Sequence, residues 1–273
     1  MVKIINSKKK FLIAEVGINH NGKLNEAVKL IDAAKKAGAD AVKFQTYITE
    51  KRVNSNSPIF NILKKCELQY EDFYKLKKYC DKKNIIFFST PFDVGSVNFL
   101  NKINVKIFKV ASFDISNYEI INEIIKTKKE VILSTGMASL KEIYKVHRKL
   151  KNRKISHALL HCISNYPNED KNSYLSNIVY LQNILKCPVG YSDHTNGIKT
   201  AFISHILGAN IIEKHFKLGK NHNCVDAKVS ITPKQFSELV ENIYNYKKIM
   251  GKVKFGIRPE ERSTKIYKRI KIK

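Results

Sequence analysis

The sequence has no tryptophan, three methionines, six prolines and five cysteines. No uninterrupted apolar run reaches about 18 residues, so we expect no membrane-spanning helix. The cysteines are odd in number and form no CxxC pair, which favours reduced thiols in a cytoplasmic protein over a disulfide framework. Lysines precede an apolar stretch near the N-terminus, but that stretch is short, contains Glu15 and lacks a cleavage site, so it indicates a first strand, not a secretory signal.

Arginine is also scarce, with six among 50 basic residues, although the net charge is +26. The lysines are spread along the whole chain, with a modest cluster after residue 251. Arginine is usually prominent where proteins read nucleic acids, so this pattern argues for a compositional bias and against nucleic acid as the main partner. A positive field would still help to gather anionic substrates.

Eight short, almost continuously apolar runs alternate with amphipathic segments, as expected for parallel strands that are covered on both sides by helices. The runs are 11–17, 41–47, 85–90, 107–112, 130–135, 155–162, 187–193 and 211–216, and the helical segments are 24–38, 71–83, 93–102, 118–126, 139–150, 173–185, 196–208 and 232–250. Eight such units in about 250 residues, without a GxGxxG turn, predict an α/β protein with one TIM (β/α)8 barrel. We assign residues 1–250 to the barrel and 251–273 to a basic tail.

The active site of such a barrel forms at the carboxyl ends of its strands. Nearly every predicted strand begins apolar and ends polar. The polar residues at these ends are Glu15, Lys43, Gln45, Thr90, Lys109, Ser112, Ser134, Thr135, His161, Ser192, His194, Glu213 and His215. One polar strand end means little, but their recurrence predicts a site at this rim.

Lys43 and Lys109 interrupt apolar strands, where an unpaired ammonium is costly to bury. They either reach the rim or pair with a carboxylate, or both face one polyanion with the hydroxyl groups of Thr90, Ser112 and Ser134. A substrate that carries both phosphate and carboxylate would need this mixture of charges and neutral donors.

His194 and His215 end the seventh and eighth strands, which are neighbours in a closed barrel. Two imidazoles there suit a borderline divalent cation such as Mn²⁺, Zn²⁺, Fe²⁺ or Co²⁺, with Asp193 or Glu213 as the acceptor behind them. Two core or general-base histidines would give the same spacing. His161 is left out of the metal set as a buried structural residue.

Two carboxylates, Glu15 in FLIAEVG and Asp114 in KVASFD, differ from ordinary surface acids because each lies at the end of an apolar strand. A carboxylate held near a metal or a phosphate can act as a general acid or base. Ion pairing with Lys43 or Lys109 would explain either carboxylate equally well. Asn19 and His20, in GINHNG, are candidate loop or turn residues.

The motifs AEVGINHNG, AVKFQTY, STPFD, FKVASFDI, LSTGMAS, HCISNYP, VGYSDHT, IIEKHF and VDAKVSITPKQF occur in this order between about residues 11 and 240. In these motifs the chain resembles the sialic acid (N-acetylneuraminate) synthases and their relatives that make pseudaminic and legionaminic acids. More distantly, it resembles other barrel enzymes that condense phosphoenolpyruvate with an aldose.

The resemblance implies condensation of phosphoenolpyruvate with N-acetylmannosamine, or with a 2,4-diacetamido sugar, and water, to give a nine-carbon 2-keto acid and phosphate. It implies a divalent cofactor, Mn²⁺ first and Mg²⁺ or Co²⁺ as alternatives, and a homodimer. The residues carried over are Lys43, Thr90, Lys109, Ser112, Ser134, Ser164 and Ser192 for phosphoenolpyruvate, His194 and His215 for the metal, Tyr166 and Asp226 for the sugar, and Glu15 and Asp114 as acid or base.

The chain departs from the family pattern at Ser164, where the family has Asn, and at Asp114, where it has Glu. Both changes alter side-chain reach and leave the choice of sugar open. The family usually carries a C-terminal antifreeze-like (SAF) domain, and we interpret the tail after 251 as the remnant of a linker to that domain, here missing. Two other functions stay open: a non-catalytic barrel that binds sugar phosphates or polyanions, and an aldolase with a Schiff base on Lys43 or Lys109.

Overall fold

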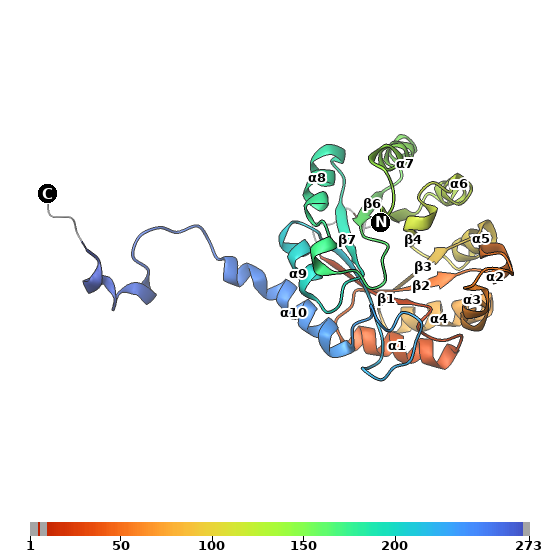
Figure 1. Ribbon diagram of the computed structural model, residues 1–273, viewed down its shortest axis with the longest axis horizontal. Coiled ribbons are helices and arrows are strands. Elements are labelled where there is room, and N and C mark those ends of the chain that lie inside the picture. Colours follow the sequence, from red (N-terminus) through yellow and green to blue (C-terminus); the bar gives the residue numbers. More distant parts are fainter. Residues whose placement is uncertain (1–4, 6–9, 270–273) are drawn as a thin grey trace. The chain divides into compact units, whose positions relative to one another are not determined.

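The computed structural model describes Ile5 and residues 10–269, in which eight parallel strands close into a barrel in chain order, β1 to β8 (Figure 1). The strands are β1 Phe11–Gly17, β2 Ala41–Thr46, β3 Ile86–Pro91, β4 Ile107–Val110, β5 Glu130–Ser134, β6 His157–His161, β7 Val189–Asp193 and β8 Ile211–His215. The last strand pairs with the first, with Glu15 opposite His215. The predicted TIM barrel is confirmed.

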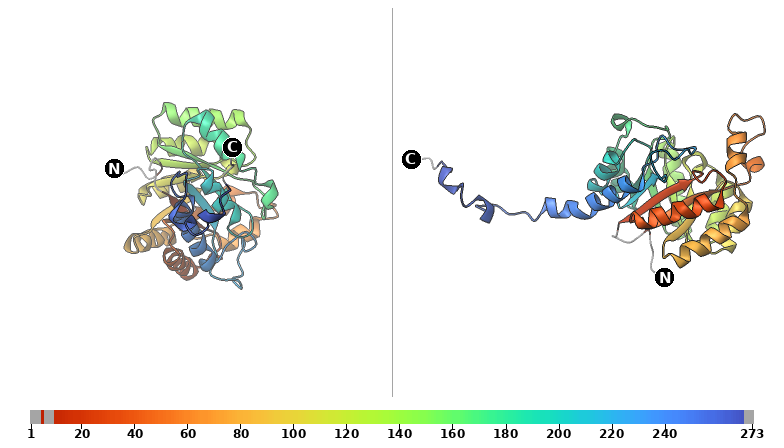
Figure 2. Two further views of the ribbon diagram at one scale, coloured as in Figure 1. Left: turned by 90° about the vertical axis from the view of Figure 1, so that its left-hand side faces the viewer. Right: turned by 90° about the horizontal axis from the view of Figure 1, so that it is seen from below.

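Helices surround the strands on the outside of the barrel (Figures 1 and 2). They are α1 Leu24–Lys36, α2 Thr49–Arg52, α3 Phe60–Cys66, α4 Tyr70–Lys82, α5 Val94–Lys102, α6 Tyr118–Lys126, α7 Leu140–Asn152, α8 Ser176–Leu185, α9 Lys199–Ile206 and α10 Pro233–Met250. Side chains fix some starts: Asp93 caps α5 through Ser96 N, and Ser139 with Glu142 forms a capping box at α7. The two short helices α2 and α3 were not among the helical segments predicted from the sequence.

The alternation of side chains along each strand divides the core into two layers. Leu12, Ala14 and Val16 of β1 face outward, into the large apolar layer between strands and helices. Phe11 and Ile13 face inward, where they meet the inward side chains of other strands at the amino end of the barrel. The interior of the barrel at its amino end is therefore filled with apolar side chains. The next inward-facing residue on each strand lies closer to the carboxyl end of the barrel.

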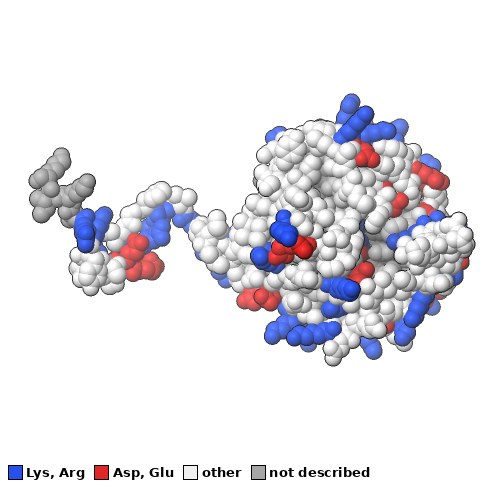
Figure 3. All heavy atoms as spheres, viewed as in Figure 1, with Lys and Arg blue, Asp and Glu red and all other residues white. Residues whose placement is uncertain are grey.

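By contact density the chain separates into a unit that ends at Ile243 and a second unit from Tyr244 onward, which contains the last turns of α10 and two short 3₁₀ segments, Pro259–Glu261 and Lys265–Tyr267. No helix among the described residues is long and apolar enough to cross a membrane. On the face of the barrel shown in Figure 3, basic side chains lie at several separate places with acidic ones between them.

Candidate active site

The inward positions become polar toward the carboxyl ends of the strands, and they enclose a cavity of about 360 Å³. On β1 the inward series Phe11, Ile13, Glu15 changes from apolar to charged, and β8 does the same with Ile211, Glu213 and His215. All of the predicted site residues line this cavity except Asp114 and Ser164; those that do are Glu15, Lys43, Thr90, Lys109, Ser112, Ser134, Tyr166, Ser192, His194, His215 and Asp226.

Lys43 stands between two buried carboxylates. Its Nζ lies 2.9 Å from Glu15 Oε2 and 3.6 Å from Glu213 Oε1, and it donates to Thr90 Oγ1 at 3.3 Å. Burial alone would lower the pKa of Lys43, but the two carboxylates raise it, so the ammonium stays charged. Burial raises the pKa of Glu15, which makes this carboxyl the better proton carrier of the two acids.

Lys109 has a different environment. Its Nζ donates to Ser134 Oγ at 2.6 Å and to the Val110 carbonyl oxygen at 3.0 Å, and it forms no ion pair with a carboxylate of the described residues. Burial lowers its pKa, because the charged form is poorly solvated. Burial raises the pKa of Glu213, but the charges of Lys109 and Lys43 outweigh this effect and lower it. An anionic ligand would stabilise the Lys109 ammonium directly.

His194 and His215 line the same cavity, with ring centroids 5.4 Å apart. His194 Nδ1 bonds to the Ile163 carbonyl oxygen at 2.7 Å, and His215 Nδ1 lies 3.3 Å from Asp226 Oδ2. The Tyr166 ring packs against His194 with centroids 4.1 Å apart. One cavity therefore holds two ammonium groups and two imidazoles.

Comparisons with protein families and with known proteins identify relatives of this chain. Residues 30–255 match the NeuB family, which is most of the chain. The chain belongs to the NeuB family. It is 38% identical over 280 residues to the N,N'-diacetyllegionaminic acid synthase of Campylobacter jejuni, covering 96% of this chain and 84% of that protein. It is 32% identical over 277 residues to the pseudaminic acid synthase of the same organism, with 96% and 81% covered.

Among solved structures, this NeuB-family chain is similar to the N-acetylneuraminic acid synthetase of Leptospira borgpetersenii, with a TM-score of 0.88, 39% identity and coverage of 96% and 93%. A truncated 3-deoxy-D-arabino-heptulosonate 7-phosphate synthase of Thermotoga maritima shares the fold at 14% identity and a TM-score of 0.72, with 91% and 92% covered. The relatives with these higher identities include synthases of legionaminic, pseudaminic and N-acetylneuraminic acids, the family that the sequence motifs indicated.

The two rim histidines of this NeuB-family barrel have the chemistry of metal ligands. The bond from His194 Nδ1 to a carbonyl leaves the Nε2 lone pair free, and burial lowers the pKa of His194 to about 4, so the ring is neutral at pH 7. For His215, burial lowers the pKa but Asp226 raises it, as a carboxylate behind a ligating imidazole does. The donor set fits a divalent cation that keeps open positions for oxygen ligands.

The acceptors behind the histidines are not the ones predicted from the sequence. Asp193 precedes His194 but faces outward, where it forms a buried ion pair with Lys214 at 3.0 Å and accepts a hydrogen bond from Thr195 N. Glu213 faces inward, but its Oε1 accepts a hydrogen bond from Ser192 Oγ and lies 3.6 Å from Lys43 Nζ. The expectation that Asp193 or Glu213 supports the histidines is wrong, because the carbonyl of Ile163 and the carboxylate of Asp226 occupy those places.

Ser164 and Asp114 lie beside the cavity, outside its lining. Ser164 Oγ is 2.8 Å from Ser112 Oγ, so it can orient a hydroxyl that does line the cavity. The carboxylate of Asp114 accepts from Asn117 Nδ2 at 3.0 Å, and burial raises its pKa. Neither position at which the sequence departs from the family pattern therefore lines the cavity itself.

Several residues that line the cavity were not predicted from the sequence. The most important of them is Arg52, at the end of α2. Its guanidinium lies 3.6 Å from the centroid of the Phe92 ring, and it donates to Gln45 Oε1 at 3.0 Å. The other missed lining residues include Cys162 on the loop after β6 and three apolar residues of the α2–α3 region, Ile59, Ile62 and Leu63.

Asn19, on the loop after β1, and His161, the last residue of β6, have structural partners. Asn19 Nδ2 donates to the Phe216 carbonyl oxygen and to Ser230 Oγ, both at 2.9 Å, and its Oδ1 accepts from Asp226 N at 3.0 Å. Asn19 thereby fixes the loop that presents Asp226 to His215. His161 Nε2 bonds to the Ser173 carbonyl oxygen at 2.7 Å, away from this cavity.

Proposed function

We propose that this chain condenses phosphoenolpyruvate with an N-acetylated amino sugar and water, releasing phosphate and a nine-carbon 2-keto sugar acid. The observation that carries the proposal is the pair of buried lysines, Lys43 and Lys109, which line the same cavity as His194 and His215. The names of the relatives, which are legionaminic, pseudaminic and N-acetylneuraminic acid synthases, support the same product class.

The lysine side of the cavity suits phosphoenolpyruvate. Lys109 forms no direct ion pair with a carboxylate of the described residues and would gain the most from the phosphate, while Lys43 already pairs with Glu15. The hydroxyl groups of Thr90, Ser112, Ser134 and Ser192 supply neutral donors around both lysines. Donors whose positions are fixed by the barrel stabilise developing negative charge without reorganising.

The histidine side suits the aldehyde of the open-chain sugar. His194 and His215 would hold Mn²⁺, or Mg²⁺ or Co²⁺, which when bound supplies Lewis-acid polarisation of a carbonyl oxygen. Tyr166, which packs on His194, and Asp226 would contact the sugar beyond it. Arg52 lies on this side as well, since its charge interacts with Asp114 and Asp226.

In the reaction, the electron pair of the C2–C3 double bond of phosphoenolpyruvate forms a bond from C3 to the aldehyde carbon of the sugar, and the aldehyde oxygen takes a proton to become a hydroxyl. Water then adds to C2 and gives up its two protons, one to replace the proton taken by the sugar oxygen and one to the departing phosphate. Cleavage of the bond between C2 and the phosphate oxygen releases phosphate and leaves the 2-keto group. Glu15 is placed to carry a proton, because burial raises its pKa while Lys43 keeps it in contact with the cavity. Asp114 approaches only from behind the lining, so we give it an orienting role.

The test is a phosphate-release assay with product mass spectrometry. We expect phosphate only when phosphoenolpyruvate, an amino sugar and a divalent metal are all present. The panel would contain N-acetylmannosamine and 2,4-diacetamido-trideoxyhexoses. Absence of product with every sugar would refute the synthase, and full turnover in chelator would refute the metal at His194 and His215. Salt-dependent polyanion binding without turnover would instead indicate the non-catalytic barrel.

A 2,4-diacetamido sugar is the second candidate acceptor, because the chain is about as similar to the legionaminic acid synthase of Campylobacter jejuni (38% identity) as to the N-acetylneuraminic acid synthetase of Leptospira borgpetersenii (39%). The Schiff-base alternative would use Lys109, whose pKa burial lowers. Borohydride with pyruvate should trap no adduct if the synthase proposal holds. We expect a cytoplasmic protein that forms a homodimer. Light scattering would measure the mass of the particle in solution and so test the dimer.

A further inference from the structure

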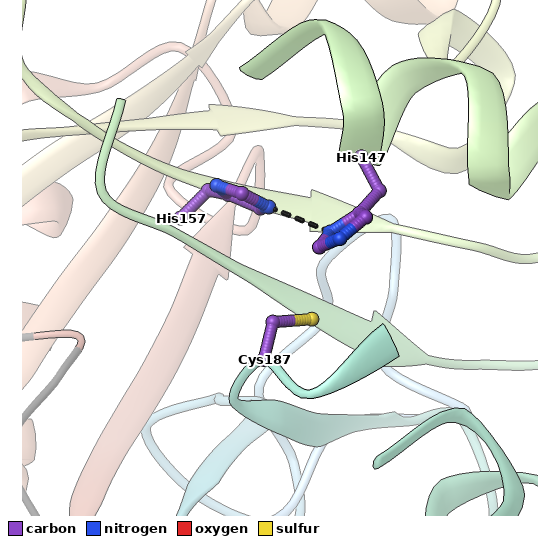
Figure 4. Close-up of side chains that lie close together, drawn as sticks. All are labelled: His147, His157 and Cys187. Atoms are coloured by element: carbon purple, nitrogen blue, oxygen red, sulfur yellow. Dashed lines mark hydrogen bonds between the residues drawn. The ribbon is translucent and has the colours of Figure 1, made fainter. Parts of the chain in front are cut away.

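Three side chains with metal-ligating atoms meet at the opposite end of the barrel from the active site. His147 lies on α7, His157 is the first residue of β6, and Cys187 lies between α8 and β7. Since β6 and β7 both begin there, the group is at the amino end of the strands. Figure 4 shows the two imidazoles and the thiol pointing toward one another from these three elements.

The spacing of the three groups is close to what one metal ion requires. His147 Nδ1 and His157 Nε2 are 3.0 Å apart, and one ligand atom from each residue, with Cys187 Sγ, lies within 4.8 Å of the others. Metal–ligand bonds of about 2.0–2.3 Å at tetrahedral angles put ligand atoms about 3.3–3.7 Å apart. Small side-chain movements therefore suffice to form a three-ligand site.

His157 already has the orientation of a metal ligand. Its Nδ1 bonds to the Ile155 carbonyl oxygen at 2.8 Å, so Nδ1 carries the hydrogen and Nε2 keeps its lone pair. That lone pair points at His147 Nδ1, which donates to it when no metal is bound. Metal-ligating histidines usually have such a backbone acceptor behind the second ring nitrogen.

The charge state of the group also suits a cation. Burial lowers the pKa of His147 and of His157, so both rings are neutral at pH 7. Burial raises the pKa of Cys187 to about 11, so the thiol must lose its proton to the solvent when a metal binds. Lys151 faces all three groups and opposes a cation, but it favours the thiolate. Cys187 is partly exposed, which gives an ion access.

We propose that His147, His157 and Cys187 bind one Zn²⁺ ion, separate from the active-site metal, with a water in the fourth position. Two imidazoles and a thiolate suit a borderline-soft ion and discriminate against Mn²⁺ and Mg²⁺, which prefer oxygen ligands. The ion would connect α7, β6 and the start of β7, so it would stabilise the barrel at the end where no chemistry occurs.

The test uses a His194→Ala/His215→Ala background, so that the active-site histidines cannot hold metal. The full chain is stripped with chelator, loaded with Zn²⁺, desalted and analysed for zinc by mass spectrometry. We expect about one zinc ion per chain. With Co²⁺ instead of Zn²⁺, we expect a thiolate-to-cobalt charge-transfer band and the strong visible bands of tetrahedral cobalt. Both signals report binding without any turnover.

The ligand variant is Cys187→Ala, and its matched control is Cys80→Ala, a buried cysteine on α4. Cys187→Ala should lose the zinc and the charge-transfer band, while Cys80→Ala should keep both. Melting curves of the metal-free proteins check that each variant is folded. Zn²⁺ should raise the melting temperature of the His194→Ala/His215→Ala background protein but not that of Cys187→Ala in this background. The proposal is overturned if the background protein retains no zinc. It is also overturned if Cys187→Ala retains as much zinc as the background protein.

Discussion

His215 Nδ1 lies 3.3 Å from Asp226 Oδ2, so the histidine that ends β8 is held by a carboxylate from the loop that follows it. Asn19 fixes that loop by accepting from Asp226 N. We expect Asp226→Asn to weaken Mn²⁺ binding by about 10–100-fold, because the amide no longer supports the imidazole. Titration of free Mn²⁺ measures this. The control is Asp170→Asn, whose carboxylate pairs with exposed Lys199, and equal Mn²⁺ affinity in both variants would contradict the role of Asp226.

The Glu15–Lys43 ion pair predicts a stability effect that can be separated from activity. Lys43→Met leaves the Glu15 carboxylate buried without its partner and should cost about 3–5 kcal/mol in the free energy of unfolding. In Glu15→Gln/Lys43→Met both charges are gone, while the positive charge of Lys109 still acts on Glu213 without an ion-pair contact, so much of the stability should return. Both variants should release no phosphate. Urea unfolding decides the matter: a double variant no more stable than Lys43→Met would show that the pair is not coupled.

The alternation along the strands explains why so much of the site could be predicted from the sequence. An apolar strand that turns polar at its carboxyl end must place alternate polar residues inside the barrel, as Glu15, Lys43 and His215 show. The same rule identifies the error over Asp193. It neighbours inward-facing Ser192, so it must face outward, and there it meets Lys214.

The segment between β2 and α4 could not be predicted in the same way. Its helices, α2 and α3, have four and seven residues, too few to show a helical period. Their position over the cavity comes from tertiary contacts, such as the bond from Tyr47 Oη to the Leu63 carbonyl oxygen. Arg52 therefore resembles an ordinary surface residue in the sequence although it lines the site.

Arg52 gives the third prediction. Its contacts lie on the proposed sugar side of the cavity, so Arg52→Ala should raise KM for the amino sugar by about 10-fold or more and leave KM for phosphoenolpyruvate nearly unchanged. Separate substrate titrations of phosphate release measure the two constants. Lys51→Ala removes a neighbouring exposed charge and should change neither. A larger effect on phosphoenolpyruvate would place Arg52 on the other side of the reaction.

Gly190 in β7 tests the packing of the barrel wall. A Cβ at this position would lie 2.2 Å from the Ile211 carbonyl oxygen and 2.7 Å from Leu160 Cδ2, and neither the strand nor the core can give way easily. Gly190→Ala should lower the free energy of unfolding by about 1–3 kcal/mol or more. Gly219→Ala, where nothing lies within 4 Å of the added carbon, should be close to neutral in the same urea titration. Equal stability of the two variants would contradict the packing at β7.

His20 predicts how stability changes with pH. Burial lowers its pKa from 6.5 to about 4, and its Nδ1 accepts from Gly22 N, a bond that protonation would break. The unfolded chain binds this proton more readily, so the stability contributed by neutral His20 is complete above pH 6.5 and is lost as the pH falls toward 4. The loss between pH 7 and 4.5 should be about 2–3 kcal/mol. His20→Gln cannot titrate, so its unfolding free energy should fall less over that range by about the same amount, whereas parallel curves for the two proteins would exclude His20 as the source.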